Sequence, residues 1–316
     1  MEVRRLQFWL PSGLFLKQEV WKLSKQCVKR DSQRFAKVQK LDWAYNWVSS
    51  FQYIHAFKNS TDFNVHLQNK MLPETKIKIR SILNICVDGA LRRTKNSRSY
   101  RPFHEALLTK SLVNASAFER SFSTSFGQGP IEQLSVLIAN DNGFICQRQK
   151  ITMVNLFKGA DDEIHRIMAA LRDGERRPNW KSEVEKLSAF AKGDTIVRRV
   201  ISDLWLQKDG IEYFFSIKTV KPNLDQTENA KRDMLTLKAH NPLNHTFFCL
   251  YYNPGGEEKS SYNWTMPFKI FDIKNDDCVL IGKDYWNTIG GPETYKELLE
   301  VFEEVGLETR PKILNM

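Results

Sequence analysis

The chain has 316 residues, of which 41% are hydrophobic and 27% are charged. This composition is typical of folded globular proteins and argues against a disordered or fibrous chain. No apolar run approaches the roughly 20 residues that a membrane helix needs, so we expect no membrane association. The net charge of +10, with lysine and arginine spread along the whole length, favours polyanionic partners.

The cysteines and histidines limit the chemistry further. The five cysteines are widely separated, form no CxxC pair and are odd in number, which predicts reduced thiols in a cytoplasmic protein. The six histidines show no metal-binding spacing such as HExxH, so zinc chemistry is not expected. The cysteines are Cys27, Cys86, Cys146, Cys249 and Cys278.

The first 70 residues differ from the rest of the chain. They are basic and rich in aromatic residues, with helical spacing in places, and a break follows at residues 69–75. We therefore expect a helical N-terminal extension over residues 1–70 and one larger domain over residues 71–316. The extension is either a module whose positive charge adds phosphate contacts, or an upstream segment from a misassigned start at which Met71 is the true first residue.

The larger domain is expected to contain both helices and strands. Apolar residues recur at helical spacing after Pro73, after Pro130, and around residues 164–171 and 184–190. The later elements are expected to be strands over residues 195–206, 211–220, 246–252 and 266–273, and helices over residues 225–239 and 292–305, the last ending at Gly306. This order predicts an α/β fold with a mixed central sheet flanked by helices.

A predicted hairpin brings two complementary side chains together. Asp209-Gly210 is the strongest short turn signal in the sequence. With these two residues as the turn, Asp203 falls opposite Ser216. Side chains alternate along strands, so Lys218 lies on the same face. A carboxylate and an ammonium group therefore converge near the open end of the hairpin.

Such a pair suits metal-assisted hydrolysis of a phosphodiester. Mg²⁺ takes one or two carboxylates, while water and substrate phosphate fill its other positions. A neighbouring lysine positions or deprotonates the attacking water and screens the charge that develops at phosphorus. The alternative is a surface salt bridge on a solvated strand. The strongly apolar residues beside Asp203 and Ser216 argue against it. Charged side chains at the ends of buried strands cost free energy of desolvation, so they are expected there only where they have a function.

Two short segments of the hairpin resemble the core motif of the PD-(D/E)xK nucleases: Ile201-Ser202-Asp203, and Phe215-Ser216-Ile217-Lys218. More closely, the chain resembles the TdeIII-like family of type II restriction endonucleases over roughly residues 72–312. The nuclease motif alone is short and degenerate, whereas four longer stretches together are far more specific. These stretches are residues 101–108 (RPFHEALL), 118–129 (FERSFSTSFGQG), 215–227 (FSIKTVKPNLDQT) and 282–291 (GKDYWNTIGG).

The resemblance implies a restriction-endonuclease-like PD-(D/E)xK core and a type II site-specific deoxyribonuclease that depends on Mg²⁺. It implies cleavage of double-stranded DNA at a short palindromic site, with a GGNCC-type sequence as the expected class. A palindromic site favours a homodimer. A cognate DNA methyltransferase that acts on the same site is the expected functional partner.

Two positions depart from the family's motif. Ser202 replaces the proline before the first acid, and Ser216 replaces the acid two residues before the lysine. Some restriction enzymes resemble this serine variant and recruit a glutamate from the following helix, for which Glu228 is the candidate here. The alternative for Glu228 is a solvated helix residue that pairs with Arg232 four positions on.

Glu132 is a second candidate for the missing acid, although a glutamate in the first turn of a helix is favourable there in any case. Because Glu228 lies away from the apolar face of its helix, we expect it to be either exposed or turned towards the active site. Glu212 shares the face of Asp203 but lies too close to the turn to serve one metal with Lys218. The expected site is therefore Asp203, Lys218, Ser216 and Glu228, with Asp203, Glu228 and Glu132 as the metal-ligand candidates.

Two other functions stay open at this point. One is a repair or recombination nuclease of the same fold, and the other is a non-catalytic DNA-binding protein in which Ser216 marks a decayed site. Cleavage of plasmid DNA in the presence of Mg²⁺ separates both enzymes from the binding protein.

Overall fold

The computed structural model describes residues 71–96, 100–127, 129–190 and 192–315, which belong to one unit of the chain. The extension expected over residues 1–70, including Cys27, lies outside the described residues. The helices are α3 (Pro73–Lys95), α4 (Pro102–Leu107), α5 (Lys110–Gly127), α6 (Pro130–Asp141), α7 (Lys158–Asp173), α8 (Trp180–Ser188), α9 (Leu224–His240), α10 (Lys283–Gly290) and α11 (Thr294–Leu314), with two short 3₁₀ helices, η1 (Lys259–Ser261) and η2 (Met266–Lys269). The strands are β1 (Ile145–Phe157), β2 (Thr195–Lys208), β3 (Ile211–Lys218), β4 (His245–Leu250) and β5 (Val279–Ile281).

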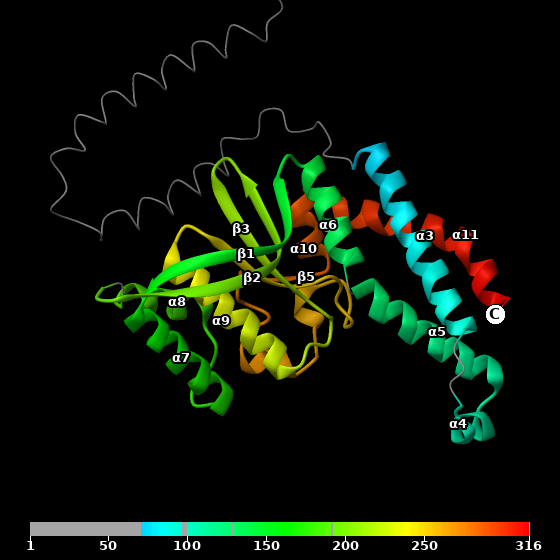
Figure 1. Cartoon of the computed structure of the whole chain (residues 1–316), viewed down its shortest axis with the longest axis horizontal. Helices are drawn as coiled ribbons and strands as arrows, with labels where there is room; N and C mark the ends of the chain where they lie inside the picture. Colours follow the sequence, from blue (N-terminus) through cyan, green and yellow to red (C-terminus); the bar gives the residue numbers. More distant parts are fainter. Residues whose placement is uncertain (1–70, 97–99, 128, 191, 316) are drawn as a thin grey trace, which may run out of the picture. The chain divides into compact units, whose positions relative to one another are not determined.

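A five-stranded mixed sheet forms the centre of this unit, in the order β1-β2-β3-β4-β5 (Figure 1). β1, β2 and β3 are antiparallel neighbours, whereas β4 and β5 run parallel to β3. α9 connects β3 to β4, because parallel neighbours need a crossover connection rather than a tight turn. The expected α/β class, with a mixed central sheet flanked by helices, is confirmed.

The β2–β3 hairpin forms around the expected turn. Asp209 and Gly210 have positive φ angles of 52° and 80°, the combination that a type I′ turn requires and that an Asp-Gly pair tolerates. The residues on either side of the turn pair with each other, and the pairing continues to Leu204 and Phe215. The turn therefore sets which residues lie side by side at the far end of the two strands.

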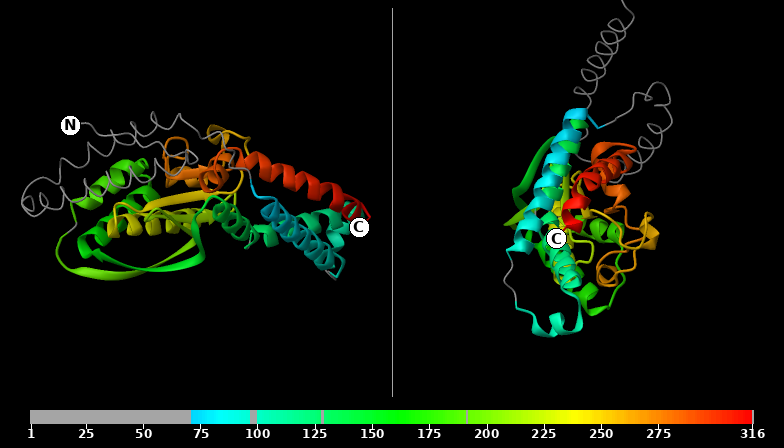
Figure 2. Two further views of the ribbon diagram at one scale, coloured as in Figure 1. Left: turned by 90° about the horizontal axis from the view of Figure 1, so that it is seen from above. Right: turned by 90° about the vertical axis from the view of Figure 1, so that its right-hand side faces the viewer.

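Helices cover both faces of the sheet, so the central strands are buried on both sides. On β4, Cys249 packs in one hydrophobic core, while its neighbours Phe248 and Leu250 pack in a second. The first core joins the sheet to α3, α5, α6, α10 and α11, and the second joins it to α7, α8 and α9. Figure 2 shows α3, α5 and α11 lying together beyond one end of the sheet.

The strand expected over residues 266–273 is wrong. The chain forms η2 here and then continues without regular structure. Pro267 has no backbone N–H to donate to a strand ladder, which disfavours a strand at this point. Ile270, Phe271 and Ile273 are fully buried in the second core, so the apolar run reflects packing rather than strand pairing.

The expected end of the last helix at Gly306 is also wrong, because α11 continues to Leu314. Val305 and Thr309 are both buried. Packing on either side therefore holds Gly306 in the helix, although glycine usually ends one. No described helix is long and apolar enough to cross a membrane, and the four cysteines in the described residues form no disulfide.

Candidate active site

Asp203 lies at a fork in the sheet. β2 pairs with β1 along almost its whole length but pairs with β3 only from Leu204 to Lys208. Figure 1 shows β1 and β2 continuing together past the point where β3 ends its pairing with β2. At the first unpaired position, Asp203 Oδ2 accepts a hydrogen bond from the backbone N–H of Ile217 at 2.7 Å. The carboxylate therefore replaces a backbone partner where the strands separate.

Lys218, the last residue of β3, contacts the same carboxylate oxygen. Its Nζ donates a hydrogen bond to Asp203 Oδ2 at 2.9 Å, and both side chains are 22% exposed. This exposure keeps the pair accessible to a substrate while shielding it from part of the surrounding water. The convergence of Asp203 and Lys218 that the hairpin register predicts is present, and their catalytic role stays a prediction.

The two other hairpin residues take different positions. Ser216 is half-buried and immediately precedes Ile217, so it lies beside the Asp203–Lys218 pair. Glu212 lies near the turn and accepts a hydrogen bond from Trp205 Nε1 at 3.0 Å. It is therefore engaged within the hairpin, away from Lys218, as the sequence indicates.

Glu132, in the first turn of α6, is joined to Asp203 through one side chain of β1. Gln149 Nε2 lies 2.9 Å from Glu132 Oε1 and 3.4 Å from Asp203 Oδ1. Arg148, the preceding residue on β1, donates from its Nε to the other carboxylate oxygen of Glu132 at 3.0 Å. Two neighbouring residues of β1 thus hold Glu132 at the edge of the Asp203 site.

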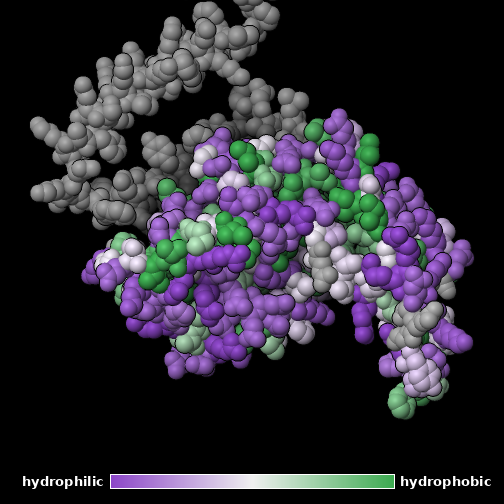
Figure 3. All heavy atoms as spheres, in the orientation of Figure 1, coloured by the Kyte–Doolittle hydropathy of each residue, from purple (hydrophilic) through white to green (hydrophobic). Residues whose placement is uncertain are grey.

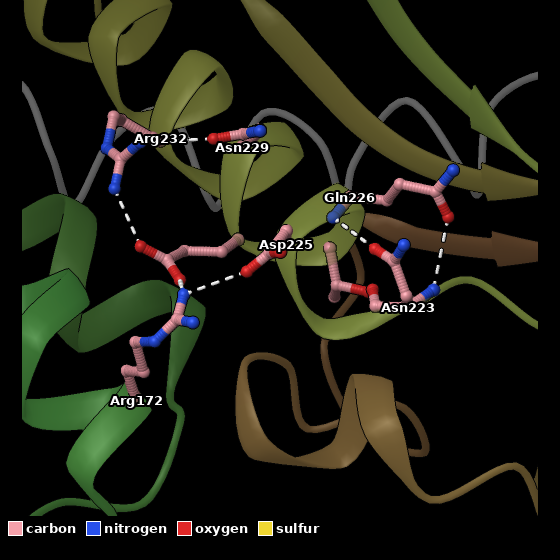
Figure 4. A network of polar contacts seen from close by, with 8 residues as sticks. Arg172, Asn223, Asp225, Gln226, Asn229 and Arg232 are labelled. Carbon is pink, nitrogen blue, oxygen red and sulfur yellow. Dashed lines mark hydrogen bonds and ion pairs between the residues drawn. The ribbon is translucent and has the colours of Figure 1, made fainter.

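Glu228 occupies a separate ion-pair network, so the expectation that it is exposed or turned towards Asp203 is not met. Glu228 is only 8% exposed. It accepts a hydrogen bond from Arg232 Nη2 at 2.7 Å and another from Arg172 of α7. Figure 4 shows Arg172 reaching from the neighbouring helix, where it also contacts Asp225 at 3.0 Å. Glu228 therefore fastens α9 to α7.

Asp233 is a neighbour of the pair that sequence reasoning missed. It lies on α9, and burial raises its pKa to about 6. The charges of Lys218 and Arg232 act against this increase, and the charge of Asp203 adds to it. Asp233 is therefore within electrostatic range of the Asp203–Lys218 pair. A lone aspartate on a helix carries no sequence signal that would have identified it.

A cavity of about 340 Å³ lies between α7, β2 and α9, and Asp233 is part of its lining. On the face drawn in Figure 3, hydrophilic residues predominate over α7 and α9. Arginines from both β2 and α9 line the cavity, so a charged group is better suited to it than an apolar one. Its charged and titratable lining residues are Asp161, His165, Arg198, Arg199, Arg232 and Asp233.

The residues around Asp203 fit a magnesium ion better than a transition metal. Among the described residues no group of three or more histidine, cysteine, aspartate or glutamate side chains is arranged to hold a metal. Mg²⁺ does not require such a cage, because it commonly binds one or two carboxylates and takes its other ligands from water and phosphate. Asp203 and Glu132 offer two carboxylates that already share one hydrogen-bond donor.

A carboxylate with an adjacent lysine, and a second carboxylate nearby, form the kind of arrangement that suits metal-assisted phosphodiester hydrolysis. Residues 71–306 match the family of the type II restriction endonuclease HinfI. The chain belongs to this family of type II restriction endonucleases. The class expected from the sequence is confirmed, while the closer likeness to TdeIII-like enzymes stays a prediction.

Individual relatives agree with this assignment. The type II restriction enzyme HgiCII of Herpetosiphon aurantiacus is 31% identical over 235 residues, which cover 72% of this chain and 85% of the relative. The type II restriction enzyme HgiBI of the same organism is 29% identical over 267 residues, which cover 76% of this chain and 96% of the relative. Both similarities extend over most of the two chains compared.

Proposed function

We propose that this protein is a Mg²⁺-dependent, site-specific endonuclease that cuts double-stranded DNA, with its active site at Asp203 and Lys218. The observation that carries the proposal is the 2.9 Å contact between these two side chains in a chain of the HinfI family. Membership of the family supports the substrate and the reaction, and the strand fork supports the position of the site.

The chain's own residues have separate tasks in this reaction. Lys218 Nζ is anchored on Asp203 and leaves its other N–H donors for the attacking water and for the phosphate oxygens. A fixed positive charge next to the phosphate stabilises the negative charge that develops there during the attack. The backbone N–H of Ile217 holds the Asp203 carboxylate in place. A bound Mg²⁺ supplies Lewis acidity and lowers the pKa of water.

We propose Asp203 and Glu132 as the two protein ligands of this magnesium ion. Glu132 shares a hydrogen-bond donor with Asp203, whereas Glu228 is occupied by Arg172 and Arg232. A carboxylate already neutralised by two guanidinium groups gains less from a cation than one held by an amide and a single arginine. This favours the first-turn glutamate of α6 over the glutamate of α9.

The finer properties of the enzyme come from the sequence resemblance. We propose a short palindromic target of the GGNCC type, action as a homodimer in the cytoplasm, and a cognate methyltransferase that protects the same site. The positive charge of the chain, +10 overall, supports binding to the DNA backbone, and this binding should weaken as salt is raised.

Incubation of the full-length protein with plasmid DNA and Mg²⁺ tests the proposal. The expected product is a set of discrete fragments whose ends map to one short palindrome, and chelation of the metal should abolish cutting. Fragments with ends at unrelated sequences would instead indicate a repair or recombination nuclease. DNA binding without cleavage, in Mg²⁺ or Mn²⁺, would indicate a non-catalytic protein and would refute the proposed function.

A further inference from the structure

The β1–β2 ladder is interrupted at one position, directly opposite Asp203. Residues pair in a single register on both sides of this point, with Arg148 opposite Leu204 and Lys150 opposite Ser202. Gln149 and Asp203, which the register places opposite each other, do not pair. Since no residue is added or lost, the interruption is a local change of backbone direction and not a slip of register.

The backbone of Gln149 explains the interruption. Its φ is 48°, in the left-handed region of backbone conformation that residues other than glycine rarely adopt. Among the described residues only Asp209 and Glu293 share this feature without being glycine, and they lie in a hairpin turn and before the first residue of α11. Gln149 is therefore the one described case within a paired strand.

Packing does not account for this conformation, because Gln149 is exposed. The backbone conformation instead determines where the side chain of Gln149 lies. The carboxamide Nε2 lies between the two acids, 2.9 Å from Glu132 and 3.4 Å from Asp203. Unfavourable backbone geometry in native proteins is concentrated at functional sites, where the surrounding structure maintains it.

We infer that Gln149 is a positioning residue, which holds the Glu132 carboxylate next to Asp203 so that a divalent cation meets two oxygens already in place. This inference rests on the proposed function and adds a residue to its site. The N–H groups of the carboxamide act between the acids before the cation binds, where they offset the mutual repulsion of two neighbouring carboxylates. Partners that orient metal ligands in this way change metal affinity by about 10–100-fold when they are removed.

Replacement of Gln149 by glycine separates this role from a structural one. Glycine adopts the left-handed backbone without strain, so Gln149→Gly removes the carboxamide and relieves the backbone together. Gln147→Gly is the matched control, since Gln147 is an exposed residue of the same strand that pairs with Trp205 and does not have a positive φ. Gln149→Ala removes the carboxamide but keeps the strain.

Three quantities are measured on the full-length proteins: the melting temperature without metal, its increase on adding Mn²⁺, and the Mg²⁺ concentration for half-maximal cleavage. We expect Gln149→Gly to melt at or above the wild-type temperature, and above Gln149→Ala. Both variants should need on the order of tenfold more Mg²⁺, with little change in the rate at saturating Mg²⁺, and should gain less stability from Mn²⁺. Gln147→Gly should melt at a lower temperature and keep the wild-type Mg²⁺ requirement.

A wild-type Mg²⁺ requirement in Gln149→Gly would overturn the inference. An equal increase in Gln147→Gly would do the same, because the effect would then follow from a weakened strand. The part of the Mn²⁺-induced increase in melting temperature that is lost in Asp203→Ala is the part due to binding at this site. If the wild type shows that part but cuts no DNA, the proposed function fails while the role of Gln149 stands. If it cuts DNA but gains nothing from Mn²⁺ at this site, the role of Gln149 fails.

Discussion

Asp203 and Lys218 meet through a single oxygen, because the Lys218 ammonium group and the neighbouring backbone N–H of Ile217 both donate to Asp203 Oδ2. Within the described part of the chain, the second oxygen, Oδ1, has only the long 3.4 Å contact with Gln149. One oxygen of the carboxylate is thus used for positioning, and the other is left with capacity for a cation.

Asp203→Ala should reduce cleavage by on the order of 10²-fold or more, because it removes a metal ligand and the anchor of Lys218. Binding to a target duplex without a divalent metal should change little. The hydrogen bond lost from the Ile217 N–H costs about 0.5–1.5 kcal/mol of unfolding free energy. Asp225→Ala is the control, since the Asp225 side chain is 72% exposed on α9. Cleavage by Asp203→Ala within tenfold of the wild-type rate would exclude Asp203 from the site.

Lys218→Ala should lose a comparable share of activity, because Lys218 Nζ contacts Asp203 Oδ2 at 2.9 Å and is the one side-chain cation of the described residues that contacts this oxygen. Lys218→Arg should not restore cleavage, since the guanidinium group is planar, stays protonated and differs in shape from an ammonium group. Single-turnover rates at saturating Mg²⁺ provide the measurement, with Lys312→Ala on α11 as the control. A fully active arginine variant would contradict the role given to Lys218.

Glu132→Gln and Glu228→Gln should change different properties of the protein. Glu132→Gln should raise the Mg²⁺ concentration needed for cleavage and leave the melting temperature almost unchanged. Glu228→Gln should keep the Mg²⁺ requirement but destabilise the fold by about 1–3 kcal/mol, because Arg172 and Arg232 lose a charged partner at a buried position. A raised Mg²⁺ requirement in Glu228→Gln, together with an unchanged requirement in Glu132→Gln, would instead make Glu228 of α9 the second metal ligand.

Asp233 makes the stability of the fold depend on pH. Its pKa is about 6 in the folded protein, against an ordinary value of 3.8, chiefly because it is buried. The folded state binds the proton more tightly, so stability falls as the pH rises from about 4 to about 6 and stays lower above that range. Asp233→Asn should therefore stabilise the protein by on the order of 2 kcal/mol at pH 7.5 and by little at pH 4. Free energies of unfolding measured with denaturant at the two pH values check this prediction, and an equal change at both would contradict it.

Residues 71–316 should fold and cut DNA without the first 70 residues. The match to the restriction endonuclease family begins at residue 71, and the sequence changes in composition at the same point. A chain that starts at Met71 should give the same fragments as the full chain, with a smaller salt dependence of binding if the extension contacts phosphates. An insoluble or inactive product would show that the functional fold includes the extension.

The sequence predicted the structure best where neighbouring residues determine the local backbone geometry. The Asp209-Gly210 turn sets the register of β2 and β3, and this register places Asp203 next to Lys218. The mixed sheet also follows from the order of the predicted elements. These features depend on short-range turn chemistry and on side-chain alternation, both of which can be read from neighbouring residues.

The remaining parts of the site depend on contacts between distant segments. β1 was not expected, because its polar run from Gln147 to Lys150 hides the alternation of a strand. The position of Gln149 between two acids could therefore not be foreseen. Helical periodicity placed Glu228 away from the apolar face of its helix, but it could not show that Arg172 of α7 covers this residue. Tertiary packing decided both cases.

The tight turn between β2 and β3 also restricts how this enzyme can diverge. A substitution along the hairpin changes one side chain and leaves every other side chain on the same face of the sheet. Insertion or deletion of one residue between the turn and Asp203, or between the turn and Lys218, would direct one of the two groups to the opposite surface of the sheet. Over evolutionary time, this segment can therefore vary in composition far more freely than in length.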